Sequence, residues 1–173
     1  RVDRRQRQMC IRDRANAELS FVNGLNITNV QTNTSGAFSA SIVDDNGTYD
    51  IFVGKWGYIS QLAENITFDN NNTSIDFTLQ SGYYDDFTLD FGWTINGNAT
   101  AGNWVRDIPF GTSNNGIESN PYFDSNSDLG EFCYVTGNAN NSSAGADDVD
   151  GGSTILTSPI FDLTNYDNAQ ISY

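Results

Sequence analysis

Short β-rich runs separated by turn signals are the feature that most restricts how this chain can fold. Between residues 15 and 80, apolar and polar residues alternate over short stretches such as Ala37–Ile42 and Thr48–Gly54. Such alternation is typical of a half-buried strand, because successive side chains point to opposite faces. Asn23-Gly24 and Asp44–Gly47 are hairpin-type turn signals between these runs. The pattern predicts about seven strands and an all-β sandwich.

The composition also favours strands over helices. Aromatic residues make up 13% of the 173 residues, and Gly, Asn, Ser and Thr are frequent, whereas the strong helix formers Lys, Glu and Met are scarce. The length suffices for one or two domains with a packed core.

The charge is negative and unevenly distributed. The formal net charge is -14, yet six of the eight Lys and Arg residues lie in the first fourteen positions, and only Lys55 and Arg106 follow. An acidic body of this kind repels nucleic acid and anionic membranes, so neither is expected as a partner. There is no apolar run of about eighteen residues, so no membrane span is predicted.

The head, residues 1–14, differs in composition from the rest of the chain. One interpretation is a basic arm that binds polyanions. The segment also resembles the translated adaptor sequence, containing MCIRDR, that contaminates metagenomic gene predictions. We therefore interpret residues 1–14 as non-native and disordered, and expect the natural N-terminus, with any export signal, to be missing.

Residues 15–80 resemble a carboxypeptidase regulatory-like domain, a seven-stranded, transthyretin-like sandwich. The resemblance is carried by Thr34–Phe38, Gly47–Ile51, Gly57-Tyr58 and Ser74–Leu79. Asn33 or Thr34 stands where that family often has Asp. The resemblance implies a fold more than an activity.

Residues 81–173 resemble the jelly-roll sandwiches related to MAM and concanavalin A-like domains. The matching segments are Asp86-Phe87, Gly92-Trp93, Trp104–Arg106, Cys133–Asn138, Asp147–Gly152 and Leu156–Pro159. We expect strands over residues 87–91, 92–95, 104–109, 132–136, 154–161 and 169–173, and a long polar loop over 110–130. The resemblance implies a truncated jelly roll, since the family domain is longer. The two modules together resemble the C-terminal half of secreted zinc carboxypeptidases and surface proteins of the Bacteroidetes type.

Most catalytic chemistries lack their residues in this chain. There is no histidine, which removes Ser–His–Asp and Cys–His mechanisms and the usual catalytic zinc sites. Cys133 has no evident base beside it, and we interpret it as a buried strand residue. Paired carboxylates for glycoside hydrolysis stay open, because spacing in the sequence does not give their separation.

Calcium is the one cofactor that the residues suggest. Asp147, Asp148 and Asp150 lie between glycines, and carboxylate oxygens are ligands that calcium prefers. The alternative is an acidic surface turn, since Asp and Gly are also turn residues. By resemblance to jelly rolls with a structural cation, Asp86 is a further ligand, and Asp124 and Asp128 are weaker candidates.

Carbohydrate is a second possible ligand. Trp93 and Trp104 can stack on sugar rings, although aromatic residues at strand positions usually belong to the core.

Together, these observations predict two non-catalytic, accessory or adhesive modules of a larger exported bacterial protein. The expected location is extracellular or at the cell surface, with carbohydrate or a cell-surface protein as partner. The alternative is an accessory region of a secreted zinc carboxypeptidase whose catalytic domain lies upstream; a carbohydrate-binding module is a further alternative.

Overall fold

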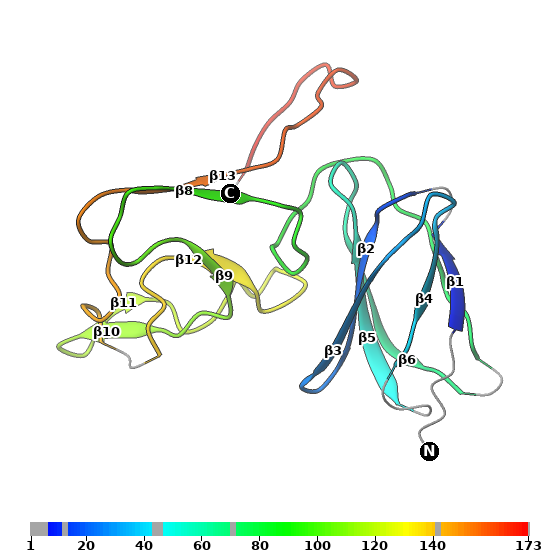
Figure 1. Ribbon diagram of the computed structural model, residues 1–173, viewed down its shortest axis with the longest axis horizontal. Coiled ribbons are helices and arrows are strands. Elements are labelled where there is room, and N and C mark those ends of the chain that lie inside the picture. The colour runs from blue at the N-terminus through cyan, green and yellow to red at the C-terminus, as the bar shows by residue number, and fades with distance from the viewer. Residues whose placement is uncertain (1–6, 12–13, 43–46, 70–71, 141–142, 173) are drawn as a thin grey trace.

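The molecule is an all-β protein built from two modules that lie along its long axis (Figure 1). The computed structural model describes residues 7–11, 14–42, 47–69, 72–140 and 143–172, and no helix occurs among them. We refer to the described residues up to 80 as the first module and to those from 81 to 172 as the second. The predicted all-β sandwich is confirmed. No helix in the described ranges has the length and apolar character needed to cross a membrane.

The larger sheet of the first module has four antiparallel strands in the order β3-β2-β5-β6. These strands are β2 (Glu18–Asn23), β3 (Asn26–Gln31), β5 (Thr48–Gly54) and β6 (Gln61–Thr67). The predicted Asn23-Gly24 turn joins β2 to β3, and Gly24 has a φ of 57°, which glycine adopts without strain. The alternating sequence of β5 predicts its bounds correctly.

The smaller sheet has the order β4-β1-β7, with β4 (Ala37–Ala40), β1 (Arg7–Ile11) and β7 (Asp76–Phe77). Strand β1 is antiparallel to β4 and parallel to β7. This placement differs from the expectation that the whole head is disordered. Ladder hydrogen bonds use backbone groups, so this strand can pair with β4 and β7 whatever the composition of the head. The remaining head residues, 1–6 and 12–13, lie outside the described part, and the origin of the segment stays a prediction.

The apolar core lies between the two sheets of the first module. Phe21 on β2 is fully buried, with its ring 6.2 Å from Phe38 on β4 and 6.3 Å from Phe68. Tyr49 on β5 reaches Phe68 at 6.2 Å, so four rings from different segments pack in one layer. The other buried apolar residues of this cluster are Ala17, Leu19, Ala40, Ile42, Ile51, Val53, Phe77 and Leu79.

A side-chain amide shapes the turn before β4. Asn33 Oδ1 accepts hydrogen bonds from the backbone N–H groups of Ser35 at 2.9 Å and Ala37 at 3.0 Å. Asn33 thus supplies the acceptor that an Asp supplies in such turns. The predicted turns at residues 44–46 and 70–71 lie outside the described residues.

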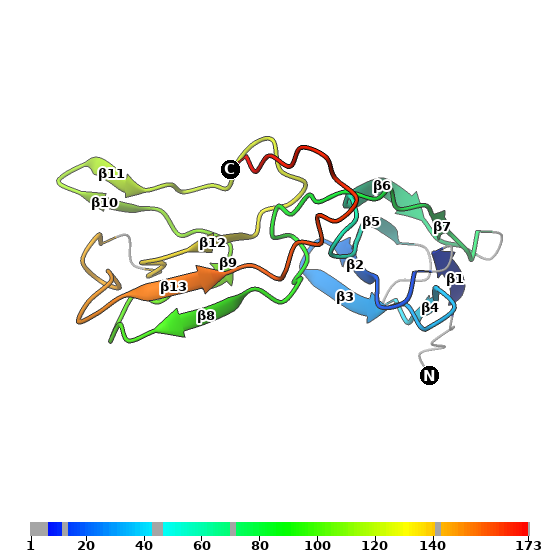
Figure 2. The ribbon, with the colours of Figure 1, turned by 90° about the horizontal axis from the view of Figure 1, so that it is seen from above.

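The second module consists of three two-stranded antiparallel ribbons (Figure 2). They pair β8 (Thr94–Gly97) with β13 (Thr154–Thr157), β9 (Val105–Asp107) with β12 (Cys133–Val135), and β10 (Thr112–Asn114) with β11 (Ile117–Asn120). The predicted strands near β8, β9, β12 and β13 are confirmed. Their assembly into a jelly roll stays a prediction.

The hairpin β10–β11 lies inside the segment that we expected to be a polar loop. Asn115 and Gly116 form its turn with φ values of 50° and 80°. Asn-Gly is the strongest short hairpin signal, so the sequence carried the evidence for this ribbon. Residues 169–172 are not a strand, and residue 173 lies outside the described range.

Residues 87–91 form turns rather than the predicted strand. Asp85 Oδ1 accepts from the N–H of Phe87 at 2.9 Å, and Asp90 Oδ1 accepts from the N–H of Gly92 at 3.0 Å. These bonds take backbone donors that a strand ladder needs. Phe87 has a φ of 65°, a left-handed conformation that breaks any extended run.

Aromatic side chains join the two modules. Trp56 of the first module lies 4.8 Å from Phe161, 6.2 Å from Phe91 and 6.4 Å from Trp93, measured between ring centroids. Its Nε1 donates a 2.8 Å hydrogen bond to the carbonyl oxygen of Ile160. Tyr83, in the connecting segment, lies 5.2 Å from Trp56. We call these rings (Trp56, Tyr83, Phe91, Trp93 and Phe161) the aromatic junction.

Gly54, at the end of β5, permits a close approach between the modules. A Cβ atom at this position would lie 2.9 Å from Leu89 Cδ1 and 2.8 Å from Phe91 Cζ. Both side chains belong to the second module, so they pack directly on the backbone of the first. The absence of a side chain at residue 54 is therefore a condition for this contact.

Replacing an aromatic residue of the core should destabilise the first module. We expect Phe21→Ala to lower the free energy of unfolding by about 3–5 kcal/mol, because it removes a large buried ring and leaves a cavity. Urea titration followed by tryptophan fluorescence measures this loss. Leu25→Ala is the control, since Leu25 is fully exposed at a hairpin tip, and should change stability by less than about 0.5 kcal/mol. Equal effects of the two substitutions would contradict the assignment of the core.

Candidate functional site

The acidic stretch at residues 145–152 packs against residues 100–102 of the second module. Asp147 Oδ1 accepts a 3.2 Å hydrogen bond from the N–H of Gly102. The carbonyl oxygen of Asp150 accepts from the N–H of Thr100 at 2.8 Å. A Cβ at Gly102, whose φ is 64°, would lie 2.5 Å from the carbonyl oxygen of Asp148. Glycine at this position thus permits the close contact between the two segments.

The four predicted calcium ligands do not form one group. Among the described residues, no three acidic, thiol or imidazole side chains are arranged to hold a metal ion. Asp148 and Asp150 are exposed, whereas Asp147 is half-buried and bonded to Gly102. In this arrangement the carboxylates fit a turn held by backbone hydrogen bonds better than a calcium cage, which needs six to eight oxygens. Calcium binding here stays a prediction.

Asp86 lies elsewhere, in the turn that begins the second module. It is buried, with Oδ1 accepting from the N–H of Thr88 at 3.1 Å and Oδ2 from the N–H of Leu129 at 3.0 Å. Both oxygens therefore have backbone donors, and the carboxylate ties the 125–130 loop to this turn. Burial raises the pKa of nearby Asp124, and the charges of Asp128 and Asp86 add to the rise.

The two candidate tryptophans differ in their surroundings. Trp93 lies within the aromatic junction, and its Nε1 donates a 2.7 Å hydrogen bond to Asp85 Oδ2. Its ring is 5.3 Å from Phe87 and 6.1 Å from Tyr134, so packing accounts for it. Trp104 is half-buried beside β9 and donates its backbone N–H to Thr154 Oγ1. Both tryptophans are half-buried, and sugar binding by either ring stays a prediction.

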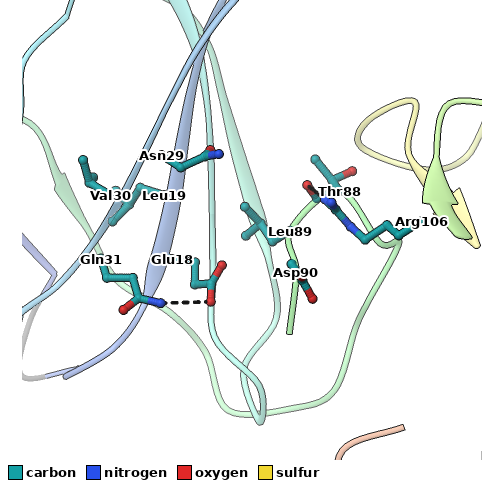
Figure 3. Close-up of a pocket in the computed structure, with 9 residues that line it drawn as sticks. All are labelled: Glu18, Leu19, Asn29, Val30, Gln31, Thr88, Leu89, Asp90 and Arg106. Carbon is teal, nitrogen blue, oxygen red and sulfur yellow. Dashed lines mark hydrogen bonds between the residues drawn. The ribbon is translucent and has the colours of Figure 1, made fainter. Parts of the chain in front are cut away.

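A cavity of about 350 Å³ opens where the two modules meet (Figure 3). The first module contributes the start of β2 and the end of β3, and the second contributes the turn after Asp86 and one residue of β9. The lining residues are Glu18, Leu19, Asn29, Val30, Gln31, Thr88, Leu89, Asp90 and Arg106. We call this space the junction cavity. Its volume lies at the lower end of the range of small-molecule sites.

Arg106 is held in place on the second-module side of the junction cavity. Its Nε donates to the carbonyl oxygen of Phe87 and its Nη2 to that of Thr88, both at 2.6 Å. The guanidinium also lies over the ring of Phe132, 4.6 Å from its centroid. The strained backbone at Phe87 is thus fixed by Arg106 as well as by Asp85.

Two carboxylates face the junction cavity from different modules. Glu18 Oε1 accepts a 3.2 Å hydrogen bond from Gln31 Nε2. Burial raises the pKa of Glu18, and the charge of Asp90 adds to this, whereas Gln31 and Arg106 lower it. The second carboxylate is Asp90. The charges of Asp90 and Arg106 thus act on the Glu18 carboxyl across the cavity, although no ion pair joins these residues within the described structure.

Sequence reasoning missed the junction cavity. Its residues come from two segments, 18–31 and 88–106, that are distant in the sequence, and no motif connects Glu18 with Asp90 or Arg106. One signal was available, since Arg106 is one of only two basic residues after the head. In a chain with so many acidic residues, a rare basic side chain indicates a position where several acidic groups lie close together.

Comparison with known proteins gives no relative for this chain. No family model matches it, and a search of curated proteins finds no match. The family resemblances stated above therefore stay predictions.

Cys133 should react slowly with electrophiles. Burial raises the pKa of its thiol to about 11, with the charges of Asp124, Asp107 and Asp128 adding to the effect. At pH 8 the thiolate fraction is then about 100-fold lower than for a thiol of unshifted pKa, and alkylation by iodoacetamide should slow accordingly. Mass spectrometry of the Cys133 peptide over time measures the rate. The same peptide in urea-unfolded protein is the reference, and equal rates in both states would contradict the shift.

Proposed function

We propose that this chain is a non-catalytic accessory or adhesive part of a larger exported protein, in which two β modules act as one rigid unit. The observation that carries the proposal is the aromatic junction. Trp56 contacts rings and a backbone carbonyl of the second module, so the modules are not joined by a flexible linker alone. A rigid pair of modules suits a spacer or a binding surface placed beside another domain.

The chemistry of the chain is in keeping with a non-catalytic role. The Cys133 thiol, the strongest nucleophile in the second module, is held protonated by its raised pKa. The carboxylates of Asp85, Asp86 and Asp90 accept hydrogen bonds from backbone N–H groups, which is a structural use. The alternative of an accessory region of a secreted zinc carboxypeptidase describes the same role in a specific parent protein.

An extracellular location belongs to this proposal. The body of the chain is strongly acidic, and high net charge keeps a protein soluble and monomeric. The partner under this proposal is a carbohydrate or a cell-surface protein.

The rigid unit has a direct test. We expect the wild-type chain to unfold in a single calorimetric transition, and Trp56→Ala to uncouple the second module, so that it loses its structure in a separate step below the temperature at which the first module unfolds. The substitution removes several ring contacts, each worth about 0.5–1.5 kcal/mol beyond the buried area. Phe123→Ala is the matched control, because Phe123 is a largely exposed ring of the second module, and should leave one transition. A single transition for Trp56→Ala would contradict the proposal.

Calcium is tested separately. If Asp147, Asp148 and Asp150 bind the ion as predicted from the sequence, adding calcium to chelated protein raises Tm. The free energy of unfolding rises by about 2.7 kcal/mol when the calcium concentration is 100-fold above Kd. Asp150→Asn should reduce this rise, whereas the exposed Asp167→Asn should not. An unchanged Tm would leave these residues as an acidic turn.

A further inference from the structure

The junction cavity is a composite site. Glu18, Asn29 and Gln31 reach it from the larger sheet of the first module, while Asp90 and Arg106 reach it from the second (Figure 3). The cavity therefore has this set of polar groups only while the modules are docked. Its position at an interface between domains is one of the common places for ligand sites.

The polar groups are fixed before any ligand arrives. Arg106 is anchored by two hydrogen bonds to backbone carbonyls and by the ring of Phe132, yet its Nη1 donates to no described residue. Glu18 is held by Gln31 through Oε1, and Asp90 by the Gly92 N–H through Oδ1. Each carboxylate keeps its second oxygen without a partner among the described residues. Rigid groups with unused hydrogen-bonding capacity lower the entropic cost of binding.

The rest of the lining is apolar or neutral. Leu89 is buried on the second-module side of the cavity. Leu19 and Val30 belong to the β2 and β3 stretches that line the cavity, but their side chains pack in the core of the first module. The exposed amide of Asn29 offers both a donor and an acceptor. A ligand that suits this lining has an apolar face and several groups that donate and accept hydrogen bonds.

The charges narrow the class of ligand. Two carboxylates and one guanidinium make the cavity negative overall, which disfavours phosphates and other anions. Hydroxyl groups can donate to Glu18 and Asp90 and accept from Arg106 and Asn29. We propose that the junction cavity binds an uncharged sugar ring, with its hydroxyls on Glu18, Asp90 and Arg106 and its C–H face on Leu89.

This inference deepens the proposed adhesive role and rests on it, because the site needs both modules docked. It places sugar binding in the junction cavity rather than on Trp93 or Trp104. The two proposals fail in different ways. Separate unfolding transitions in the wild-type chain would overturn the rigid unit, whereas a rigid chain that binds no sugar would overturn only this one.

Saturation-transfer NMR on the full chain tests the proposal. Glucose, galactose, mannose and N-acetylglucosamine, each at millimolar concentration, are the probes. We expect transfer to at least one of them, and about tenfold or greater weakening in Glu18→Gln and Asp90→Asn, because each removes a charged hydrogen-bond acceptor. Glu64→Gln, an exposed acid on β6 outside the cavity, is the matched control and should bind as the wild type does.

A further cavity variant separates loss of binding from loss of the fold. Asn29→Ala changes an exposed side chain, so the fold should persist while binding weakens. Each variant is first shown to keep the single calorimetric transition. No transfer from any of the four sugars, equal transfer in all variants, or preferential binding of inorganic phosphate or methylammonium would overturn the proposal.

Discussion

The contact between Trp56 and the second module is the interaction on which the rest of the structure depends. Tilted and edge-to-face ring contacts, together with the indole hydrogen bond, define one relative position of the modules, because both direction and distance are constrained. Gly54 allows Leu89 and Phe91 to reach the backbone of β5. The junction cavity and the set of charges that line it follow from this docking geometry.

In the second module, Asp carboxylates stabilise the local backbone by accepting hydrogen bonds from N–H groups. Asp85, Asp86, Asp90 and Asp162 each accept backbone N–H bonds within two residues, which closes local turns. Arg106 does the complementary task by binding two backbone carbonyls. A chain with so few cations thus uses its acids to satisfy backbone donors, and acidic clusters in such a sequence indicate turns before they indicate metals.

The sequence was most informative where one face of a strand is buried. Alternation located β2 and β5 well, because a slip of one residue would expose their core side chains. It failed at residues 87–91, where the same alternation is overridden by Asp side chains that capture backbone donors. The Asn115-Gly116 pair is a hairpin signal, but the polar composition of the surrounding segment favoured a loop. The junction cavity could not be predicted from the sequence, because it forms where segments distant in the chain pack together. No sequence pattern links Glu18 with Asp90 or Arg106.

Most buried apolar side chains belong to the first module, and this affects the order in which the two modules fold. Of the buried apolar side chains in the described structure, the second module contributes Leu89 and Pro109, and all the others belong to the first module. The first module can therefore collapse around Phe21 while the second still lacks a core of its own. Trp56 and Ile160 are 104 positions apart, so their contact closes a long loop late in folding. We therefore expect the first module to fold first and the ribbons of the second to become ordered on it.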